Sequence, residues 1–359
     1  MQLRDLLEAL VVRNASDLHL CVGTPPQFRI HGDLVPMGGQ ALTKEMCERL
    51  IDEMLDEERR ATLEKTRELD FSFGVDGLGR FRVNVFWQRG TKAAALRVIP
   101  IRIPTFTELG LPEQTLQRLA SLPNGMVLVT GPTGSGKSTT LAAMVDYINQ
   151  TRPCHVISIE DPVEYLHRHK KAMVVQRELG SDTLAFHEAL KRVLREDPNV
   201  VLIGEMRDLE TIAAALTVAE TGHLVLSTLH TSDAANSIAR MIDVFPERQQ
   251  QQIRTQISLV LQAVIVQQLL PTLDGQGRCL ALEIMIVTPA IRNLIREEKL
   301  EQIYSHIQMG SGIGMVTMNA SLAELYRRGK ISFEMALSKS NNEKEMLRLL
   351  ESVGARSVA

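Results

Sequence analysis

The sequence MVLVTGPTGSGKST, residues 126–139, decides the fold of this chain. Residues 126–130 form a short apolar run of the kind that makes a buried strand. The eight residues after it, 131–138, match the pattern G-x-x-x-x-G-K-[ST], and the run from Thr139 to Asn149 continues as a helix. A glycine-rich loop between a strand and a helix directs backbone N–H groups and the helix dipole at an anion. The stretch therefore predicts a phosphate-binding loop in an α/β domain.

This loop supplies candidate ligands for a nucleotide and its metal ion. In loops of this kind the lysine reaches the β- and γ-phosphates and the next hydroxyl holds Mg²⁺, which assigns these roles to Lys137 and Ser138. A chance glycine-rich turn would lack the flanking strand and helix that this sequence predicts. We therefore expect ATP and Mg²⁺ to bind here. The candidate nucleotide-binding residues are Gly131, Pro132, Thr133, Gly134, Ser135, Gly136, Lys137, Ser138 and Thr139.

Two segments place carboxylates at the ends of predicted strands, where phosphoryl transfer needs a group that positions water or a metal ion. Residues 200–208, VVLIGEMRD, are an apolar strand followed by Glu205. Glu205 is our candidate for orienting or deprotonating the attacking water, or for holding Mg²⁺ through water. Residues 157–164, ISIEDPVE, supply Glu164 as the second candidate. The alternative for each is a solvated acid at a strand end, and the other two acids of that second loop can be explained as capping or bracing groups.

A histidine and two arginines complete the set of catalytic candidates. His230 comes shortly after the apolar run 224–228, so the carboxyl end of that strand would direct it toward the nucleotide. A lone histidine is, however, more often a structural group. In the first third of the chain, Arg82 and Arg97 lie on strands of alternating polarity. They are either ordinary surface arginines or fingers that reach the γ-phosphate.

The chain changes its pattern near residue 100. After residue 125, apolar runs alternate with helical stretches, which is typical of a parallel sheet covered on both faces. A stretch rich in proline and glycine precedes this pattern and predicts a small α/β domain at 1–100, a linker at 101–113 and a second domain at 114–359. The first domain is expected to hold a short helix at about 3–11, strands at 17–20, 27–31, 81–87 and 93–99 and a charged amphipathic helix at 42–63. The helical tail, about 289–359, is expected to hold helices near 289–297, 300–308, 319–328 and 342–352.

Composition disfavours several classes of function. The 359 residues carry 40 Lys and Arg against 43 Asp and Glu, a net charge of −3, and 4% of them are aromatic. A protein that binds nucleic acid usually has a basic face and stacking aromatics, so direct binding is disfavoured and a local basic groove is left open. The four cysteines are scattered, and we find neither a signal peptide nor a membrane-spanning run. We therefore expect a cytoplasmic protein that reaches a membrane only through partners.

Four blocks stand in the order GPTGSGKST, ISIEDPVEY, VVLIGEMRDLET and TGHLVLSTLHT. Together they resemble the Walker A motif, Asp box, Walker B motif and His box of the secretion-ATPase superfamily, which drives type II secretion and type IV pili. The resemblance covers nearly the whole chain, including ASDLHL at 15–20 and GRFRVN at 79–84. AIRNLIRE at 290–297 is similar to a motif of the retraction ATPases. We also expect neither the extra N-terminal domain nor the four-cysteine metal cluster found in many extension and secretion motors.

The resemblance implies a homohexameric motor that hydrolyses ATP to retract type IV pili, as in twitching motility. Each protomer would bind ATP between an N-terminal PAS-like domain and a C-terminal RecA-like domain. Glu164 would belong to the Asp box, Glu205 to the Walker B motif and His230 to the His box, with Arg82 and Arg97 as closing fingers. The implied partners are other copies of the chain and a pilus platform protein of the inner membrane, at its cytoplasmic face. Whether a second retraction ATPase assists is left open.

The sequence departs from the family pattern at two places. The process that the motor drives is therefore less well defined than its nucleotide site. Asn319 stands where the family usually has Asp, and the tail after Ser338 is individual. We expect neither departure to touch the nucleotide site. A related motor for pilus extension or type II secretion, and a nucleotide-gated regulator that does not hydrolyse ATP, therefore remain alternatives.

The helix predicted at 289–297 has one apolar and one charged face. Thr288 is its expected N-cap, followed by a proline that suits the first helical position. The apolar face is expected to be buried and consists of Ile291, Leu294 and Ile295. The charged residues are expected to meet a partner or another subunit: Arg292, Arg296 and Glu297. On spacing alone, an ordinary surface helix is an equal alternative.

Overall fold

The computed structural model describes residues 2–30, 32–100 and 102–356. His31 at the end of a predicted strand, Ile101 at the start of the predicted linker and residues 357–359 of the predicted tail lie outside the described residues. The chain divides into two compact units. Unit 1 comprises Met1–Arg102 with Glu164–Leu166, and unit 2 comprises Ile103–Val163 with His167–Ala359.

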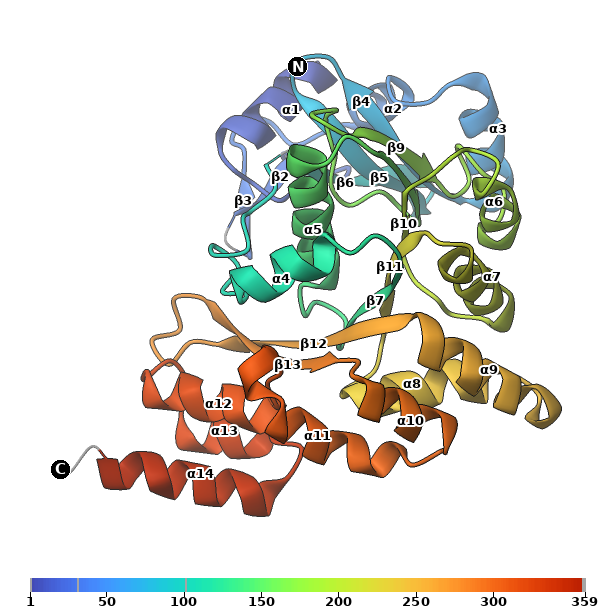
Figure 1. The fold of residues 1–359 in the computed structure, drawn as a ribbon. Helices are drawn as coiled ribbons and strands as arrows, with labels where there is room; N and C mark the ends of the chain where they lie inside the picture. Colours follow the sequence, from blue (N-terminus) through green and yellow to red (C-terminus); the bar gives the residue numbers. More distant parts are fainter. Residues whose placement is uncertain (1, 31, 101, 357–359) are drawn as a thin grey trace. The chain divides into compact units, whose positions relative to one another are not determined.

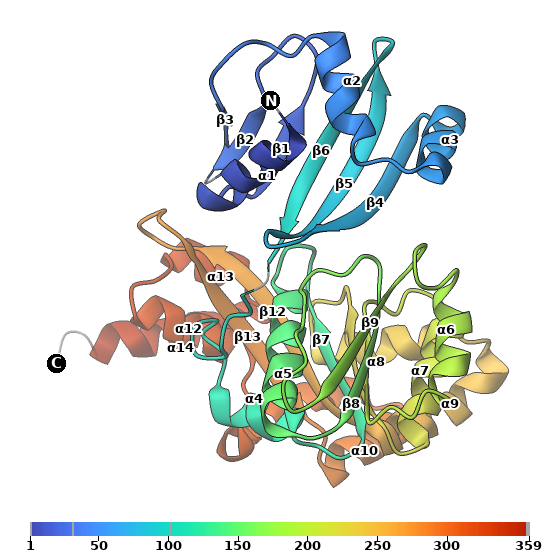
Figure 2. The same ribbon diagram turned by 90° about the horizontal axis from the view of Figure 1, so that it is seen from above.

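Unit 1 is built on an antiparallel six-stranded sheet in the order β3-β2-β1-β6-β5-β4 (Figure 2). Its strands are β1 (Asp17–Leu20), β2 (Gln27–Ile30), β3 (Asp33–Pro36), β4 (Glu68–Val75), β5 (Gly79–Gln88) and β6 (Thr91–Ile99). Along β5, Phe81, Val83 and Val85 are buried and Arg82 is exposed, which is the alternation of a sheet with one covered face. Three helices complete the core on the covered face: α1 (Leu3–Val12), α2 (Lys44–Asp52) and α3 (Glu57–Thr66).

The prediction of a single helix at 42–63 is wrong, because the structure has two helices there. The second helix, α3, begins after Asp56, whose side chain accepts a hydrogen bond from a backbone N–H of the first turn. An acceptor in this position satisfies an N–H group that has no partner within the helix and so favours a new helix start. Met54 and Leu55 between the helices are buried. The apolar pattern of the sequence therefore continues across the break and does not reveal it. The four strands predicted in this unit are present, whereas β3 and β4 were not predicted.

Unit 2 contains a seven-stranded sheet in the order β13-β12-β7-β11-β10-β8-β9. Its strands run parallel except for β13, which pairs antiparallel with β12 at one edge. The strands are β7 (Gly125–Thr130), β8 (His155–Glu160), β9 (Met173–Glu178), β10 (Val200–Ile203), β11 (Leu224–Leu229), β12 (Leu261–Pro271) and β13 (Arg278–Ile286). The predicted parallel sheet is thus confirmed, and β9, β12 and β13 are added to it.

Helices cover both faces of this sheet (Figure 2). On one face, α4 (Glu113–Ala120) and α5 (Lys137–Thr151) pack over Val127 and Val129 of β7. Met126 and Leu128 of the same strand belong to the core of the other face. The helices on that face are α6 (Phe186–Val193), α7 (Leu209–Glu220), α8 (Ala234–Asp243) and α9 (Glu247–Val260). Because β7 is buried on both faces, it is apolar throughout, and this made it predictable.

The C-terminal part of unit 2 is helical (Figure 1). It comprises α10 (Pro289–Arg296), the 3₁₀ turn η1 (Leu300–Gln302), α11 (Ile303–Met309), the 3₁₀ turn η2 (Ser311–Ile313), α12 (Met318–Arg327), α13 (Phe333–Ser338) and α14 (Glu343–Arg356). The predicted helices of the tail are present, and α13 was not predicted. Thr288 caps α10 as expected, by accepting a hydrogen bond from Ile291 N. In the described ranges, no helix has both the length and the apolar composition needed to cross a membrane.

Candidate nucleotide site

The phosphate-binding loop, Gly131–Gly136, joins the carboxyl end of β7 to the start of α5 within unit 2. Gly131 has a φ of +138°, and a Cβ atom there would stand 2.2 Å from Gln267 O on the adjacent strand β12. Gly136 has a φ of +90° and directly precedes α5. Glycine tolerates both backbone angles, and no side chain would fit at Gly131. The glycines therefore shape a turn that presents the positive amino end of α5 to the loop.

Lys137, the first residue of α5, turns back over the loop. Its Nζ donates to Gly131 O at 2.9 Å and to Pro132 O at 3.0 Å, and it lies 3.4 Å from His230 Nδ1. In the same loop, Ser135 Oγ is buried and has no hydrogen-bond partner among the residues that the structure describes. Buried polar atoms are normally paired, so a loop that holds an ammonium and an orphaned hydroxyl suits an anionic ligand.

His230 connects the loop to the acid that follows β10. Its Nε2 is 3.3 Å from Glu205 Oε1, so the imidazole lies between Lys137 and Glu205. Both contacts are satisfied when Nδ1 accepts from the Lys137 ammonium and Nε2–H donates to Glu205. Arg207 Nη2 donates to Glu205 Oε2 at 2.8 Å. The four side chains Lys137, His230, Glu205 and Arg207 form a continuous series of polar contacts, which we call the polar relay.

The register of the sheet explains why these residues meet. β11 lies between β7 and β10, and the last residue of β11 pairs with the last residue of β7. The phosphate-binding loop, His230 and Glu205 therefore follow the carboxyl ends of three adjacent strands, where ligands of such sheets bind. Thr228 Oγ1 donates to Gly204 O at 2.7 Å and so holds the turn before Glu205.

The surroundings keep Glu205 in its carboxylate form. Partial burial raises its pKa, but the hydrogen bond from Arg207, the interaction with His230 and the charge of Arg207 outweigh burial and lower the pKa below its usual value. The Glu205 side chain is 23% exposed, so water can reach it. An ionised, accessible carboxylate can accept a proton from water or hold a metal ion through water.

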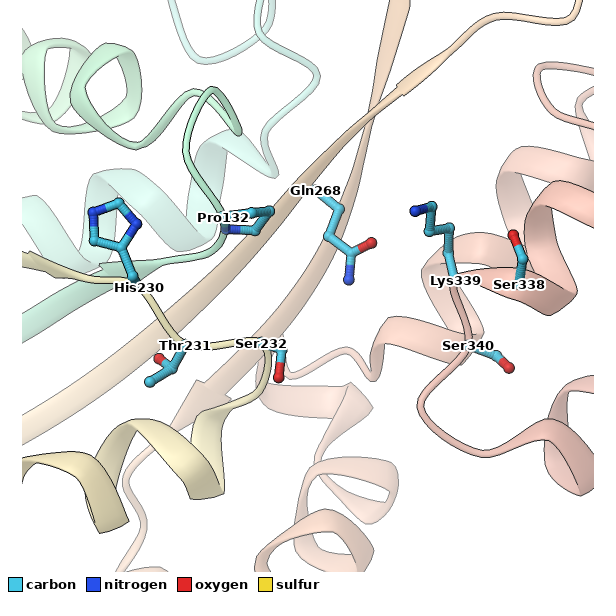
Figure 3. A pocket seen from close by; sticks show the side chains of 8 residues that line it. All are labelled: Pro132, His230, Thr231, Ser232, Gln268, Ser338, Lys339 and Ser340. Atoms are coloured by element: carbon cyan, nitrogen blue, oxygen red, sulfur yellow. The ribbon is translucent and has the colours of Figure 1, made fainter. Parts of the chain in front are cut away.

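A pocket of about 310 Å³ opens beside the polar relay (Figure 3). The phosphate-binding loop contributes Pro132 to its lining, the loop after β11 contributes His230–Ser232, and β12 contributes Gln268. The remaining wall is Ser338–Ser340, which includes the end of α13 and the start of its connection to α14. A second pocket of about 110 Å³ shares Pro132, Gln268 and Lys339 with the first. The C-terminal tail therefore lines the same hollow as the phosphate-binding loop.

The other predicted catalytic residues belong to unit 1. Arg82 on β5 and Arg97 on β6 lie opposite each other across the two strands, and both are exposed. Arg97 Nε donates to Asp17 Oδ1 at 2.8 Å, so this arginine is engaged within its own sheet. Glu164 is exposed and lies in the short segment that groups with unit 1. The contacts described for the polar relay thus join the predicted loop to His230 and Glu205, and do not include these three residues.

Sequence reasoning missed three residues of the site. Arg207 donates a hydrogen bond to Glu205. Its position two residues after that acid is the feature of the sequence that could have indicated this role. Gln267 is buried on β12, where its Nε2 donates to Thr140 Oγ1 of α5 at 2.9 Å. Lys339 lies far along the chain from the loop that it approaches, and no local pattern marks it.

The residues present fit a nucleoside phosphate and its Mg²⁺. The helix start, the ammonium of Lys137 and the buried hydroxyl of Ser135 suit phosphate groups. Mg²⁺ in such sites takes one or two protein oxygens and completes its shell with phosphate and water. Ser138, half-buried in the first turn of α5, and Glu205 carry oxygens of this kind. Among the residues that the structure describes, no group of three or more His, Cys, Asp or Glu side chains is arranged to hold a metal ion.

The chain is similar to known bacterial proteins over nearly its full length. The profile of a family described as type II/IV secretion system protein matches residues 2–348. The type IV pilus retraction ATPase PilT of Pseudomonas aeruginosa is 50% identical over 340 residues, which cover 95% of this chain and 98% of that protein. A twitching motility protein of Neisseria gonorrhoeae is 48% identical over 321 residues, 89% of this chain and 86% of that protein. A crystal structure of the pilus retraction motor PilT with bound ADP has a TM-score of 0.91 at 49% identity, covering 97% of this chain and 99% of the other.

Proposed function

Because this chain belongs to the type II/IV secretion system protein family, we propose that it is an ATPase motor that retracts type IV pili and so drives twitching motility. The observation that carries the proposal is the polar relay, which joins the phosphate-binding loop to an ionised acid. A retraction ATPase that is 50% identical over nearly both whole chains supports it. The proposed reaction converts ATP and water into ADP and phosphate and couples this step to mechanical work.

Each residue of the relay has a defined task in this proposal. The N–H groups of the loop and the Lys137 ammonium bind the β- and γ-phosphates of ATP. Glu205 orients the attacking water or accepts its proton, a task that an ionised carboxylate can perform. His230 contacts both Lys137 and Glu205, so loss of the γ-phosphate beside Lys137 would change the interactions of Glu205. Arg207 keeps Glu205 ionised and holds one of its oxygens in place.

The remaining candidates keep supporting roles. Ser138 would hold Mg²⁺ directly and Glu205 through water; when bound, the ion neutralises charge on the transferring phosphate. Glu164 is the second acidic candidate, from the segment that groups with unit 1. Arg82 and Arg97 carry planar, permanently charged donors, which suit the charge that develops on the γ-phosphate. We propose that these arginines act as fingers on the nucleotide.

We further propose that the motor works as a homohexameric ring at the cytoplasmic face of the inner membrane. Domains at 1–100 and 114–359, joined by a linker at 101–113, would close and open around ATP, which turns hydrolysis into rigid-body motion. The partner that receives this motion would be the pilus platform protein in that membrane. The ring would reach the membrane only through this partner and would not bind nucleic acid.

The test compares cells that lack this gene with cells complemented by the wild type, by Glu205→Ala or by Glu247→Ala, which changes an exposed acid on α9. We expect the deletion to give non-motile cells with excess pili, rescued by the wild type and by Glu247→Ala but not by Glu205→Ala. Purified Glu205→Ala should fold, form rings and bind ATP, while its rate of hydrolysis falls by about 100-fold or more.

Two outcomes would contradict the proposal. Cells that lose their pili on deletion would identify an extension motor. Full rescue by Glu205→Ala would mean that hydrolysis is not what this chain contributes, and a nucleotide-gated regulator would replace the motor.

A further inference from the structure

Lys339 lines both pockets beside the phosphate-binding loop, although it belongs to the C-terminal tail. In each pocket it shares the lining with Pro132 of the loop and Gln268 of β12. Figure 3 shows its side chain extending from the tail on the side of Gln268. The larger pocket is otherwise lined by hydroxyls, an amide, a proline and His230. Lys339 is therefore the permanent positive charge of this lining.

Buried hydrogen bonds hold this part of the tail in place. Asn319, fully buried near the start of α12, donates through Nδ2 to Asn342 O and to Glu345 Oε2, each at 2.8 Å. Its Oδ1 accepts from Asn341 N at 3.1 Å. One side chain thus fixes the backbone shortly after Lys339. A satisfied buried network of this kind rigidifies the segment that it joins, so the position of Lys339 is set by the fold.

The neighbours of Lys339 use their polar atoms locally. Ser338 Oγ donates to Met335 O at 3.1 Å, and Ser340 Oγ donates to Leu337 O at 2.8 Å. Lys339 itself is exposed, and within the described part of the chain its ammonium makes no hydrogen bond or ion pair. An ammonium on the wall of a pocket, with no acid beside it, is available to an anionic ligand.

We infer that Lys339 is a nucleotide-binding residue whose ammonium contacts a phosphate of the nucleoside di- or triphosphate held by the phosphate-binding loop. This inference rests on the proposed function, because it adds a residue to the same site. A lysine is a compact charge on a flexible stem, and it binds phosphate without a fixed bidentate geometry. Nucleotide binding would then connect the C-terminal tail to the phosphate-binding loop.

The experiment measures ADP binding by calorimetry and steady-state ATP hydrolysis for full-length wild type, Lys339→Ala, Lys339→Arg and Lys344→Ala. Lys344 is exposed on α14 of the same tail and lines neither pocket, so its substitution removes an equal charge. We expect Lys339→Ala to raise the Kd of ADP and the KM of ATP by about three- to tenfold, with a smaller change in kcat. Lys339→Arg should recover most of the affinity, and Lys344→Ala should match the wild type.

Equal ADP affinity in the wild type and Lys339→Ala would overturn the inference. An equal loss of affinity in Lys344→Ala would also overturn it, because the effect would then come from the general charge of the tail. A wild type that binds ADP but does not hydrolyse ATP would instead overturn the proposed function, while the comparison of ADP affinities would still decide the role of Lys339.

Discussion

Asn319 shows how a single amide group decides a local structure. The resemblance to the secretion ATPases predicts aspartate here, but a carboxylate has no N–H to offer to Asn342 O or to Glu345. Tyr304 OH and Gln308 Nε2 also donate to the Glu345 carboxylate. Burial, together with this bond to Glu345, raises the pKa of Tyr304, which keeps its hydroxyl proton available. The asparagine that replaces the expected aspartate therefore finds acceptors for its N–H groups in the tail.

Replacing Asn319 by Asp should loosen the tail. The new carboxylate would face Glu345 Oε2 across a contact of 2.8 Å and would leave Asn342 O without its donor. Such losses cost about 1–3 kcal/mol. Trypsin cleavage after Lys339 and Lys344, mapped by mass spectrometry, should become about 10- to 100-fold faster, because cleavage follows local opening. Asn341→Asp makes the same change on an exposed side chain of the tail and should cleave like the wild type. If Asn319→Asp also cleaves at the wild-type rate, Asn319 does not hold the tail.

At the scale of elements, α10 packs with its charged side as well as its apolar side. Its three apolar residues are buried, as predicted. Arg292 was expected to meet a partner, and the structure shows it engaged within its own chain. Its guanidinium donates to Ser258 O and to Leu259 O at 2.9 Å in the last turn of α9, and to Gln262 Oε1 of β12 at 3.1 Å. Carbonyl groups in the last turn of a helix have no partner within the helix, and Arg292 supplies one.

Arg292→Ala should therefore weaken the end of α9. Removing donors from carbonyl groups in a packed interface costs about 1–3 kcal/mol, which corresponds to about tenfold or more in local opening. Hydrogen exchange measured by mass spectrometry on peptides from residues 247–260 should be faster by this factor. Arg296 bonds to Asn293 of its own helix, so Arg296→Ala is the matched control and should leave exchange in α9 unchanged. If hydrogen exchange in α9 is unchanged in both variants, the Arg292 side chain does not stabilise the end of α9.

The elements that could be predicted carry their signal in their own residues. β7 and β10 are apolar because both faces of the sheet are covered, and the phosphate-binding loop follows from its motif. β12 was missed because it mixes glutamines into a long apolar run, in which strand and helix are not distinguished by periodicity. The break between α2 and α3 depends on one capping residue, Asp56, inside a continuous apolar pattern.

The residues of the site also fall into those that a local sequence pattern predicts and those that depend on packing between distant parts of the chain. Glu205 and His230 come shortly after strands and Lys137 lies in the motif, so local rules find them. The pairing of Arg207 with Glu205 depends on the conformations of both side chains. Lys339 reaches the hollow through the packing of α12, α13 and α14, which no local pattern encodes.

At the scale of the whole molecule, folding should depend on the protonation of Glu283 in the core of unit 2. Glu283 is 1% exposed, and its Oε1 accepts from Ala234 N at 2.9 Å. Its pKa is raised to about 7, chiefly by burial and also by the charge of Asp233, while backbone hydrogen bonds from Ala234 and Met318 oppose the shift. The charge of Glu283 in turn raises the pKa of Tyr304, after the larger effects of burial and of Glu345. Glu283 thus joins the start of α8, just after the loop of His230, to the start of α12.

The raised pKa makes the folded state less stable as the pH rises. In the unfolded chain the Glu283 carboxyl loses its proton near its ordinary value of 4.5, whereas in the folded chain it keeps the proton up to about 7. Between these values the folded state binds more protons than the unfolded state, so the free energy of unfolding falls as the pH increases. The fall is complete above the folded pKa and amounts to about 3 kcal/mol in all.

Glu283→Gln should remove this pH dependence. The amide oxygen can still accept from Ala234 N, and the side chain cannot ionise, so the unfolding free energy of the variant relative to the wild type should rise by up to about 3 kcal/mol between about pH 5 and about pH 8. Chemical denaturation followed by circular dichroism across this range measures the difference. Glu301→Gln changes an exposed acid of the same unit and should follow the wild-type curve. Parallel curves for Glu283→Gln and the wild type would mean that Glu283 releases its proton at the same pH in the folded and unfolded chains, and its burial would then have no influence on stability.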